Sequence, residues 1–285
     1  MEVGERPKKL RLLALHGGGT NAGIFRQQLQ MVARHLPEVE FVYLDGPIVY
    51  DESFPIDQNI LRVFPNQVYR YWFKISMDNN GVPVGFPVED VRNGINYIVS
   101  KLQETGPIDG VIGFSQGAIA ATMLVALCEA GLLELPPGIS PFKFCVLFSP
   151  SYFGWIDTIR QAFPVTGTSN GVGSTGKHRV EAFSSLVATA AALYAGEEDP
   201  ALQRFHDLHA LCVPEAEKHI HPGSHMVPID PNSVETIRVF LEKAAGVVLN
   251  KPPPRPLSAR PQSARASRPG SARPMSGARP PEQKQ

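Results

Sequence analysis

The chain has 285 residues, of which 43% are hydrophobic, so it can bury a sizeable core as one large domain or two small ones. No apolar stretch of about 18 residues occurs, and the polar N-terminus lacks the apolar segment of a signal peptide, so no membrane span is expected. Cys128, Cys145 and Cys212 lie far apart in apolar runs and are expected to be reduced, buried thiols. The expected location is the cytoplasm, and the nucleus is also compatible with the sequence.

The zero net charge hides a basic C-terminal segment. Residues 250–285 hold eight basic residues, one acidic residue and nine of the 27 prolines, so they carry +7 and the remainder carries −7. A segment of this composition, without aromatic residues, cannot bury enough apolar surface to offset the entropy lost on ordering. We therefore predict a folded domain over residues 1–249 and a disordered basic tail over 250–285, which acidic surfaces would attract.

The N-terminal part begins with a buried strand over residues 10–15, which leads directly into His16-Gly17-Gly18-Gly19-Thr20. Residues 22–36 show the apolar spacing of a helix, with Asn21 as its N-cap. A second strand is expected over residues 39–44. The glycine-rich stretch therefore joins a strand to a helix.

The segment from residue 46 to 86 is rich in aromatic side chains. It holds eight of the 24 aromatic residues, namely Tyr50, Phe54, Phe64, Tyr69, Tyr71, Trp72, Phe73 and Phe86. Prolines and glycines interrupt any long element. The aromatic residues either line or cover a substrate pocket or fill the core beside the sheet. A helix over residues 88–105 follows.

Residues 113–117 read Gly-Phe-Ser-Gln-Gly, the G-x-S-x-G pattern, between an apolar run at 108–112 and a helical run at 118–127. A serine at such a strand-to-helix elbow adopts a strained backbone that exposes its hydroxyl. The N-terminus of the following helix stabilises negative charge at the same point. Ser115 is therefore a candidate nucleophile, and a chance pentapeptide is the alternative.

The remaining elements alternate between strands and helices. Strands are expected over residues 142–148, 187–195 and 217–221, with helices over 199–212 and 234–248. This alternation predicts an α/β fold with a mostly parallel sheet of about six strands flanked by helices. In such sheets the chemistry gathers beyond the carboxyl ends of the strands.

A further stretch, residues 164–177, is rich in Gly, Ser and Thr and is expected to be a mobile loop. Its residues 171–177 match the G-x-x-x-x-G-K pattern of a phosphate-binding loop. His178 stands where Ser or Thr would hold magnesium, and no clear strand precedes the stretch, so nucleotide binding is not expected.

A serine nucleophile needs a base, and the base needs an orienting acid. Asp199 is the candidate acid, although Glu197 and Glu198 compete for the role and Asp199 could instead cap the helix that follows, with Pro200 at its first position. The order serine, acid, histidine matches the α/β-hydrolase order.

His225 is the candidate base because it follows a Pro-Gly turn in a loop that can reach Ser115. His219 and His221 alternate along a predicted strand and would remain on one face within the sheet. The clustered histidines lack carboxylate or cysteine partners at metal-ligand spacing, so we expect neither a metal nor a cofactor. The backbone N–H groups of Gly18 and Gln116 are the candidate oxyanion hole.

Four motifs, in one order, resemble the FSH family of serine hydrolases: Leu15-His16-Gly17-Gly18-Gly19-Thr20-Asn21, Gly113 to Gly117, Gly196-x-x-Asp199 and Pro222-Gly-Ser-His225-x-x-Pro228. The resemblance covers about Lys9 to Leu249. It implies a compact α/β-hydrolase fold, a Ser115–Asp199–His225 triad and hydrolysis of carboxylic esters or thioesters. The loop around Asn170 looks inserted relative to the family, and the basic tail is extra.

The expected function is hydrolysis of a small ester or thioester substrate through an acyl-enzyme. An acyltransferase could use the same triad, because exclusion of water decides between the two. A binding or scaffold protein that acts through its basic tail is the alternative from a different class. The sequence leaves the oligomeric state and the acyl group open.

Overall fold

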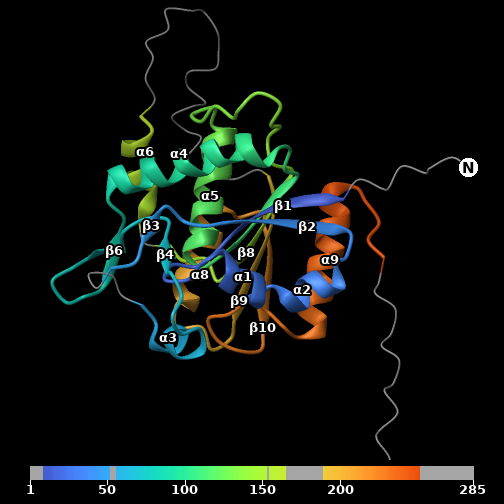
Figure 1. Cartoon of the computed structure of the whole chain (residues 1–285), viewed down its shortest axis with the longest axis horizontal. Helices are drawn as coiled ribbons and strands as arrows, with labels where there is room; N and C mark the ends of the chain where they lie inside the picture. The colour runs from blue at the N-terminus through green and yellow to red at the C-terminus, as the bar shows by residue number, and fades with distance from the viewer. Residues whose placement is uncertain (1–8, 52–55, 153, 165–188, 251–285) are drawn as a thin grey trace, which may run out of the picture. The chain divides into compact units, whose positions relative to one another are not determined.

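Six parallel strands form the central sheet (Figure 1). Their spatial order is β10 (Glu217–His221), β9 (Ala190–Gly196), β8 (Phe144–Phe148), β7 (Gly110–Phe114), β1 (Leu10–Leu15) and β2 (Val39–Leu44). The computed structural model describes residues 9–51, 56–152, 154–164 and 189–250. All of these belong to one unit, Met1–Pro252. The predicted parallel α/β sheet is confirmed.

The burial of each strand follows its place in the sheet. The four inner strands are almost wholly buried, which explains why their sequences are continuous apolar runs. The edge strands β2 and β10 mix buried and half-exposed residues instead. Because all pairings are parallel, the segments that follow the strands gather at one edge of the sheet.

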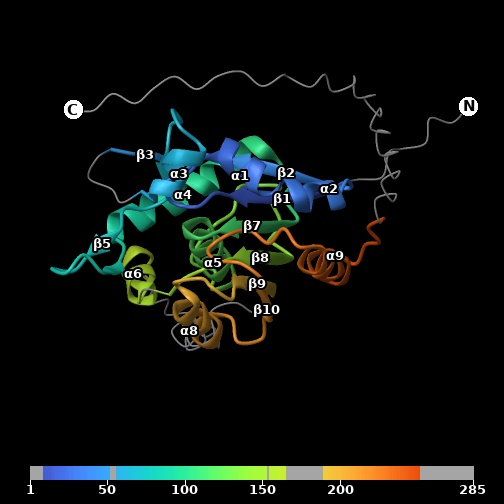
Figure 2. The ribbon, with the colours of Figure 1, turned by 90° about the horizontal axis from the view of Figure 1, so that it is seen from below.

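Helices cover both faces of the sheet, and Figure 2 shows α9 and α5 on opposite sides of the strands. One face packs on α1 (Ala22–Gln28), α2 (Gln30–His35) and α9 (Pro231–Ala245). The other packs on α4 (Val88–Thr105), α5 (Gln116–Glu129), α6 (Trp155–Ala162) and α8 (Leu202–Cys212). Each face therefore has its own apolar core.

The predicted element boundaries hold for β1, β2, β10 and α4, whereas other elements differ by one to three residues at an end; α8, for example, begins at Leu202 rather than residue 199. Local geometry accounts for the differences in two regions. Residues 22–36 form two helices rather than one, because Leu29 leaves helical geometry with φ −78° and ψ −1°. The last helix begins at Pro231 rather than residue 234, since Asp230 caps it by accepting the N–H of Ser233. It ends at Gly246, which is left-handed.

The aromatic-rich segment forms short elements outside the main sheet. These are β3 (Ile48–Val49), α3 (Gln58–Val63), β4 (Arg70–Tyr71), β5 (Ser76–Met77) and β6 (Pro83–Gly85). Strands β3 and β4 pair, as do β5 and β6. An isolated bridge between Thr20 and Arg70 ties the segment to the glycine-rich stretch after β1. Trp72 and Phe73 are fully buried in the core beneath α4 and α5.

Several other predictions concern single features. The three cysteines are free thiols; Cys145 and Cys212 are buried, and Cys128 is half-buried. None of the described helices is long and apolar enough to cross a membrane. The Gly- and Ser-rich loop beyond Pro164 and the tail beyond Asn250 lie outside the described residues.

Candidate active site

Ser115 lies at the turn between β7 and α5. Its backbone adopts φ 51° and ψ −117°, a conformation that costs a side-chain-bearing residue about 1–3 kcal/mol. The structure holds it there: the Ser115 N–H donates to the carbonyl of Phe148 at 2.8 Å, and its own carbonyl accepts the N–H groups of Ala118 and Ile119. The strained elbow is therefore as the motif predicts.

Gly117 permits this turn because the backbone of β1 passes very close to it. A Cβ atom at Gly117 would lie 2.1 Å from the carbonyl oxygen of Leu15. Any larger residue would push α5 away from β1. The last glycine of the motif thus seats the helix N-terminus against the strand that leads to Gly18.

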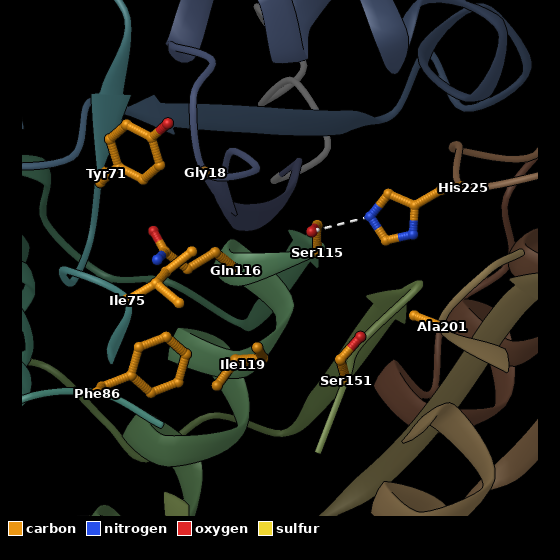
Figure 3. A pocket seen from close by; sticks show the side chains of 10 residues that line it. All are labelled: Gly18, Tyr71, Ile75, Phe86, Ser115, Gln116, Ile119, Ser151, Ala201 and His225. Atoms are coloured by element: carbon orange, nitrogen blue, oxygen red, sulfur yellow. Dashed lines mark hydrogen bonds between the residues drawn. The ribbon is translucent and has the colours of Figure 1, made fainter. Parts of the chain in front are cut away.

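The structure brings together Ser115, Asp199 and His225, which three separate segments supply. The Nε2 atom of His225 lies 2.9 Å from the Ser115 hydroxyl (Figure 3). Its Nδ1 atom lies 2.9 Å from Oδ2 and 3.1 Å from Oδ1 of Asp199. Because each ring nitrogen meets one partner, the imidazole forms a continuous link between the hydroxyl and the carboxylate.

Asp199 also makes the helix-start contact that was its alternative role. Its Oδ1 accepts the N–H of Ala201 at 2.8 Å, and its carbonyl accepts the N–H of Leu202, the first residue of α8. The two roles coexist, and the backbone contact fixes the carboxylate that faces His225. The competing residues Glu197 and Glu198 are exposed.

The environment of Asp199 favours its charged form. Burial by itself raises the pKa of this carboxyl, but the hydrogen bonds from His225 and Ala201 outweigh it and hold the pKa below the ordinary value. Its side chain is only 1% exposed, whereas that of His225 is 35% exposed. A buried anion therefore lies behind an imidazole that solvent and substrate can reach.

The loops that carry the acid and the histidine are joined by hydrogen bonds. The N–H of Glu197 donates to the carbonyl of His221 at 3.0 Å, and that of Glu198 donates to Gly223 at 2.9 Å. The Ser224 hydroxyl adds a bond to the carbonyl of Glu198 at 3.0 Å. The separation between the carboxylate and the imidazole is consequently set by backbone contacts.

His16 organises the glycine-rich loop after β1. The ring is fully buried, and its Nε2 accepts the N–H of Gly46 at 2.8 Å while Nδ1 lies 2.7 Å from the carbonyl of Gly17. These partners require the neutral tautomer with the proton on Nδ1. Burial, the largest effect, lowers the pKa of His16 to about 4. The ring is thus a structural support rather than a proton carrier.

The loop places Gly18 beside Ser115, where both line the same cavity. Within the described part of the chain, the N–H groups of Gly18 and Gln116 donate to no other residue, whereas the Gly19 N–H donates to the carbonyl of Arg70 at 2.9 Å. Two backbone donors are therefore available near the Ser115 hydroxyl, at the positive end of the α5 dipole.

Sequence reasoning missed the role of the Gln116 side chain, which is buried. Its Oε1 accepts the N–H of Trp72 and its Nε2 donates to the carbonyl of Phe73, both at 2.8 Å. The amide thus fixes the strand that carries Tyr71 to the nucleophile elbow. No local pattern could have indicated this, because the partners lie more than forty residues away in the sequence.

A cavity of about 210 Å³ opens beside Ser115 and His225. The side chains that line it are those of Tyr71, Ile75, Phe86, Ser115, Gln116, Ile119, Ser151, Ala201 and His225, together with the backbone of Gly18 (Figure 3). Two residues of the aromatic-rich segment, Tyr71 and Phe86, therefore line the cavity, while Trp72 and Phe73 fill the core. The segment thus contributes side chains both to a cavity wall and to the core. The sequence did not single out Ser151, Ala201 or Ile119.

The remaining histidines of the C-terminal part stay away from this site. His219 and His221 lie on β10, where His219 stacks on Tyr194 with ring centroids 4.7 Å apart and His221 is buried. No group of three or more histidine, cysteine or acidic side chains among the described residues is placed to hold a metal ion.

The chain matches a known family of proteins. The family model described as serine hydrolase (FSH1) matches residues 3–237. The chain belongs to this serine hydrolase family. The resemblance that the four motifs indicated is confirmed.

Similar curated proteins carry esterase or thioesterase names. An esterase of Caenorhabditis elegans is 33% identical over 144 residues, which are 50% of this chain and 59% of the relative. The dihydromonacolin L-[lovastatin nonaketide synthase] thioesterase of Aspergillus terreus is 36% identical over 138 residues, or 45% and 52% of the two chains. The matched part is between 26% and 59% of the first four relatives.

The solved structure of acyl-protein thioesterase 2 from Zea mays has a TM-score of 0.55 and 17% identity with this chain. The match covers 84% of this chain and 95% of the maize chain. At this level of identity the likeness concerns the fold. It confirms the predicted α/β-hydrolase architecture.

Proposed function

We propose that this hydrolase cleaves carboxylic esters or thioesters through an acyl-enzyme formed on Ser115. The observation that carries the proposal is the hydrogen-bonded chain from the Ser115 hydroxyl through His225 to Asp199, with contacts of 2.9 Å on either side of the imidazole. The esterase and thioesterase names of the similar proteins support the same reaction class.

In the first half-reaction, the Ser115 oxygen attacks the carbonyl carbon of the substrate while its proton passes to Nε2 of His225. The carbonyl oxygen becomes an oxyanion, which the N–H groups of Gly18 and Gln116 stabilise. The tetrahedral species collapses, the bond to the leaving oxygen or sulfur breaks, and His225 returns the proton to that atom. An alcohol or thiol departs and the acyl group remains on Ser115.

In the second half-reaction, water attacks the acyl carbon and gives its proton to His225. The bond to the Ser115 oxygen then breaks and the imidazole returns the proton to this oxygen, so that a carboxylic acid leaves and the enzyme is regenerated. Asp199 stabilises the imidazolium in both halves and keeps the ring in the tautomer that accepts at Nε2. Besides the substrate and one water molecule, these steps use only groups of the chain.

The test combines covalent labelling with turnover. A fluorophosphonate probe is expected to label the wild type but not Ser115→Ala, and hydrolysis of p-nitrophenyl butanoate is expected to fall at least about 10⁴-fold in the variant. Ser100→Ala, which removes an exposed hydroxyl on α4, serves as the matched control and should behave as the wild type. Labelling of Ser115→Ala would overturn the assignment of the nucleophile.

The same assay separates the alternative functions. A scaffold protein would show neither labelling nor turnover. An acyltransferase would be labelled, but it would release acid slowly and accelerate when an alcohol or amine acceptor is added. The hydrolase is expected to release acid and alcohol in equal amounts without an acceptor.

A further inference from the structure

The cavity beside Ser115 has two chemically different walls. Ile75, Phe86 and Ile119 form an apolar side. Figure 3 shows Ser151 across the cavity from Tyr71, Ile75 and Phe86, with its hydroxyl directed to the side where Ser115 and His225 lie. A ligand that fills the cavity thus meets hydrocarbon on one side and a hydroxyl on the other.

Ser151 is a largely buried residue that lines the cavity. The residue is only 5% exposed, and its hydroxyl forms no hydrogen bond with any residue that the structure describes. Its backbone is held, because its carbonyl accepts the indole N–H of Trp155 at 3.4 Å and the next residue, Tyr152, donates to Arg204 at 3.1 Å. An oxygen of a ligand in the cavity could form a hydrogen bond with this hydroxyl.

Other polar side chains of the cavity wall are already engaged, among them Tyr71 and Gln116. Both ends of the Gln116 amide are already bonded, to Trp72 and to Phe73. His225 and Ser115 are already hydrogen-bonded to each other. Ser151 therefore offers the bound group a hydroxyl that no described residue engages.

We propose that Ser151 selects short acyl groups that carry a hydroxyl or carbonyl oxygen near the scissile carbonyl, an inference that rests on the proposed ester hydrolysis at Ser115. The acyl group is the part concerned because it stays bonded to Ser115, at the mouth of the cavity, after the leaving group has gone. The volume of about 210 Å³ lies below the ~300–1,000 Å³ typical of sites for drug-sized ligands, so the acyl group is short.

The test uses two p-nitrophenyl esters of equal size. The acyl groups are 3-hydroxybutanoyl and 3-methylbutanoyl, which differ by a hydroxyl in place of a methyl group. Since a net hydrogen bond contributes about 0.5–1.5 kcal/mol, the wild type is expected to prefer the hydroxy ester by about 2- to 10-fold in kcat/KM. Ser151→Ala is expected to lose this preference.

Two controls make the result specific. Ser233→Ala removes another buried serine hydroxyl, on α9 at the other face of the sheet, and should keep the preference. The rate of fluorophosphonate labelling reports whether Ser115 stays reactive in Ser151→Ala, independently of any acyl hydroxyl. The inference is supported if Ser151→Ala is still labelled by the fluorophosphonate but no longer prefers the hydroxy ester.

The contrary outcomes are distinct. If the wild type hydrolyses both esters at equal rates, or if Ser151→Ala keeps the preference, the assignment to Ser151 is wrong while the proposed hydrolysis stands. A preference that appears only when the hydroxyl is moved to the leaving alcohol would overturn the placement of the acyl group. Failure of the wild type to hydrolyse either ester would overturn the proposed function and this inference with it.

Discussion

The carboxylate of Asp199 makes two contacts at once, one with a helix N-terminus and one with His225. Its carboxylate accepts the N–H of Ala201 at the start of α8 and faces the Nδ1 atom of His225. The backbone bond fixes the carboxylate, and the fixed carboxylate orients the imidazole. Gln116 follows Ser115 directly, and its side chain holds the backbone of Trp72 and Phe73.

Asp199→Asn is the substitution that tests the acid at this scale. The amide keeps the size of the side chain but can present an N–H to Nδ1, which favours the wrong imidazole tautomer, so kcat is expected to fall about 10⁴-fold. Steady-state kinetics on a p-nitrophenyl ester measures the effect. Glu197→Gln and Glu198→Gln remove exposed carboxylates and are matched controls; a loss confined to one of them would make Asp199 the wrong acid.

The loops after β9 and β10 act as one unit because their backbones touch. Gly196 ends β9 where the β10 loop passes, and a Cβ there would lie 2.2 Å from the carbonyl oxygen of Ser224. Three hydrogen bonds between the two loops follow directly after this contact. The approach of Asp199 to His225 thus depends on a glycine that takes no part in the chemistry.

Gly196→Ala should therefore damage catalysis through geometry alone. The added methyl group must push the two loops apart, and a displacement of about 1 Å in a catalytic group costs on the order of 100-fold in rate. The measurement is kcat/KM together with circular dichroism to show that the fold remains. Gly138→Ala is the control. A Cβ at Gly138 would meet open space, so this substitution changes backbone strain without a clash. Wild-type activity in a folded Gly196→Ala would contradict the account.

The loop after β1 depends on a buried histidine in its neutral form. The folded-state pKa of His16 is about 4, below the ordinary value near 6.5, so the unfolded chain takes up a proton first as the pH falls. Stability from this residue is present above about pH 6.5 and declines as the pH drops toward 4. At pH 4.5 the loss amounts to about 2–3 kcal/mol.

Urea unfolding of the wild type and of His16→Gln at pH 7 and pH 4.5 measures this contribution. The variant is expected to be less stable at pH 7. Between pH 7 and pH 4.5, its free energy of unfolding should fall by about 2–3 kcal/mol less than that of the wild type. Comparing the two proteins removes the effect of the other titrating groups. Equal pH dependence in both would show that His16 is not held neutral.

At the scale of the whole molecule, the described elements and every proposed catalytic residue lie before residue 250. The sequence therefore predicts that the segment beyond Asn250, with its charge of +7, is separable from catalysis. Acidic surfaces are its expected partners, and that attraction is screened by salt.

Truncation after Asn250 tests this division of the chain. The kcat/KM on a small p-nitrophenyl ester is expected to equal that of the full chain within about twofold, while salt-sensitive binding to an anionic vesicle is expected to weaken. A truncated protein that folds but has lost its activity would place the tail within the active site. Unchanged vesicle binding would show that the charge of the tail does not carry the attraction.

The sequence alone determined the sheet and the segments that meet at its edge. The apolar runs that become β1, β7, β8 and β9 predict buried parallel strands, because a strand covered on both faces needs no polar residue. The motif at Ser115 predicts its strained elbow, because that conformation is local. The positions of Asp199 and His225 after predicted strands indicate that they gather at one edge.

Only the tertiary structure shows that Asp199, rather than Glu197 or Glu198, is buried against His225, because the three acidic residues are consecutive in the sequence. The hydrogen bonds of the Gln116 side chain and the position of Ser151 in the cavity wall could likewise not be predicted from the sequence. Each depends on segments tens of residues apart that meet through packing, and such contacts leave no period or spacing along the chain.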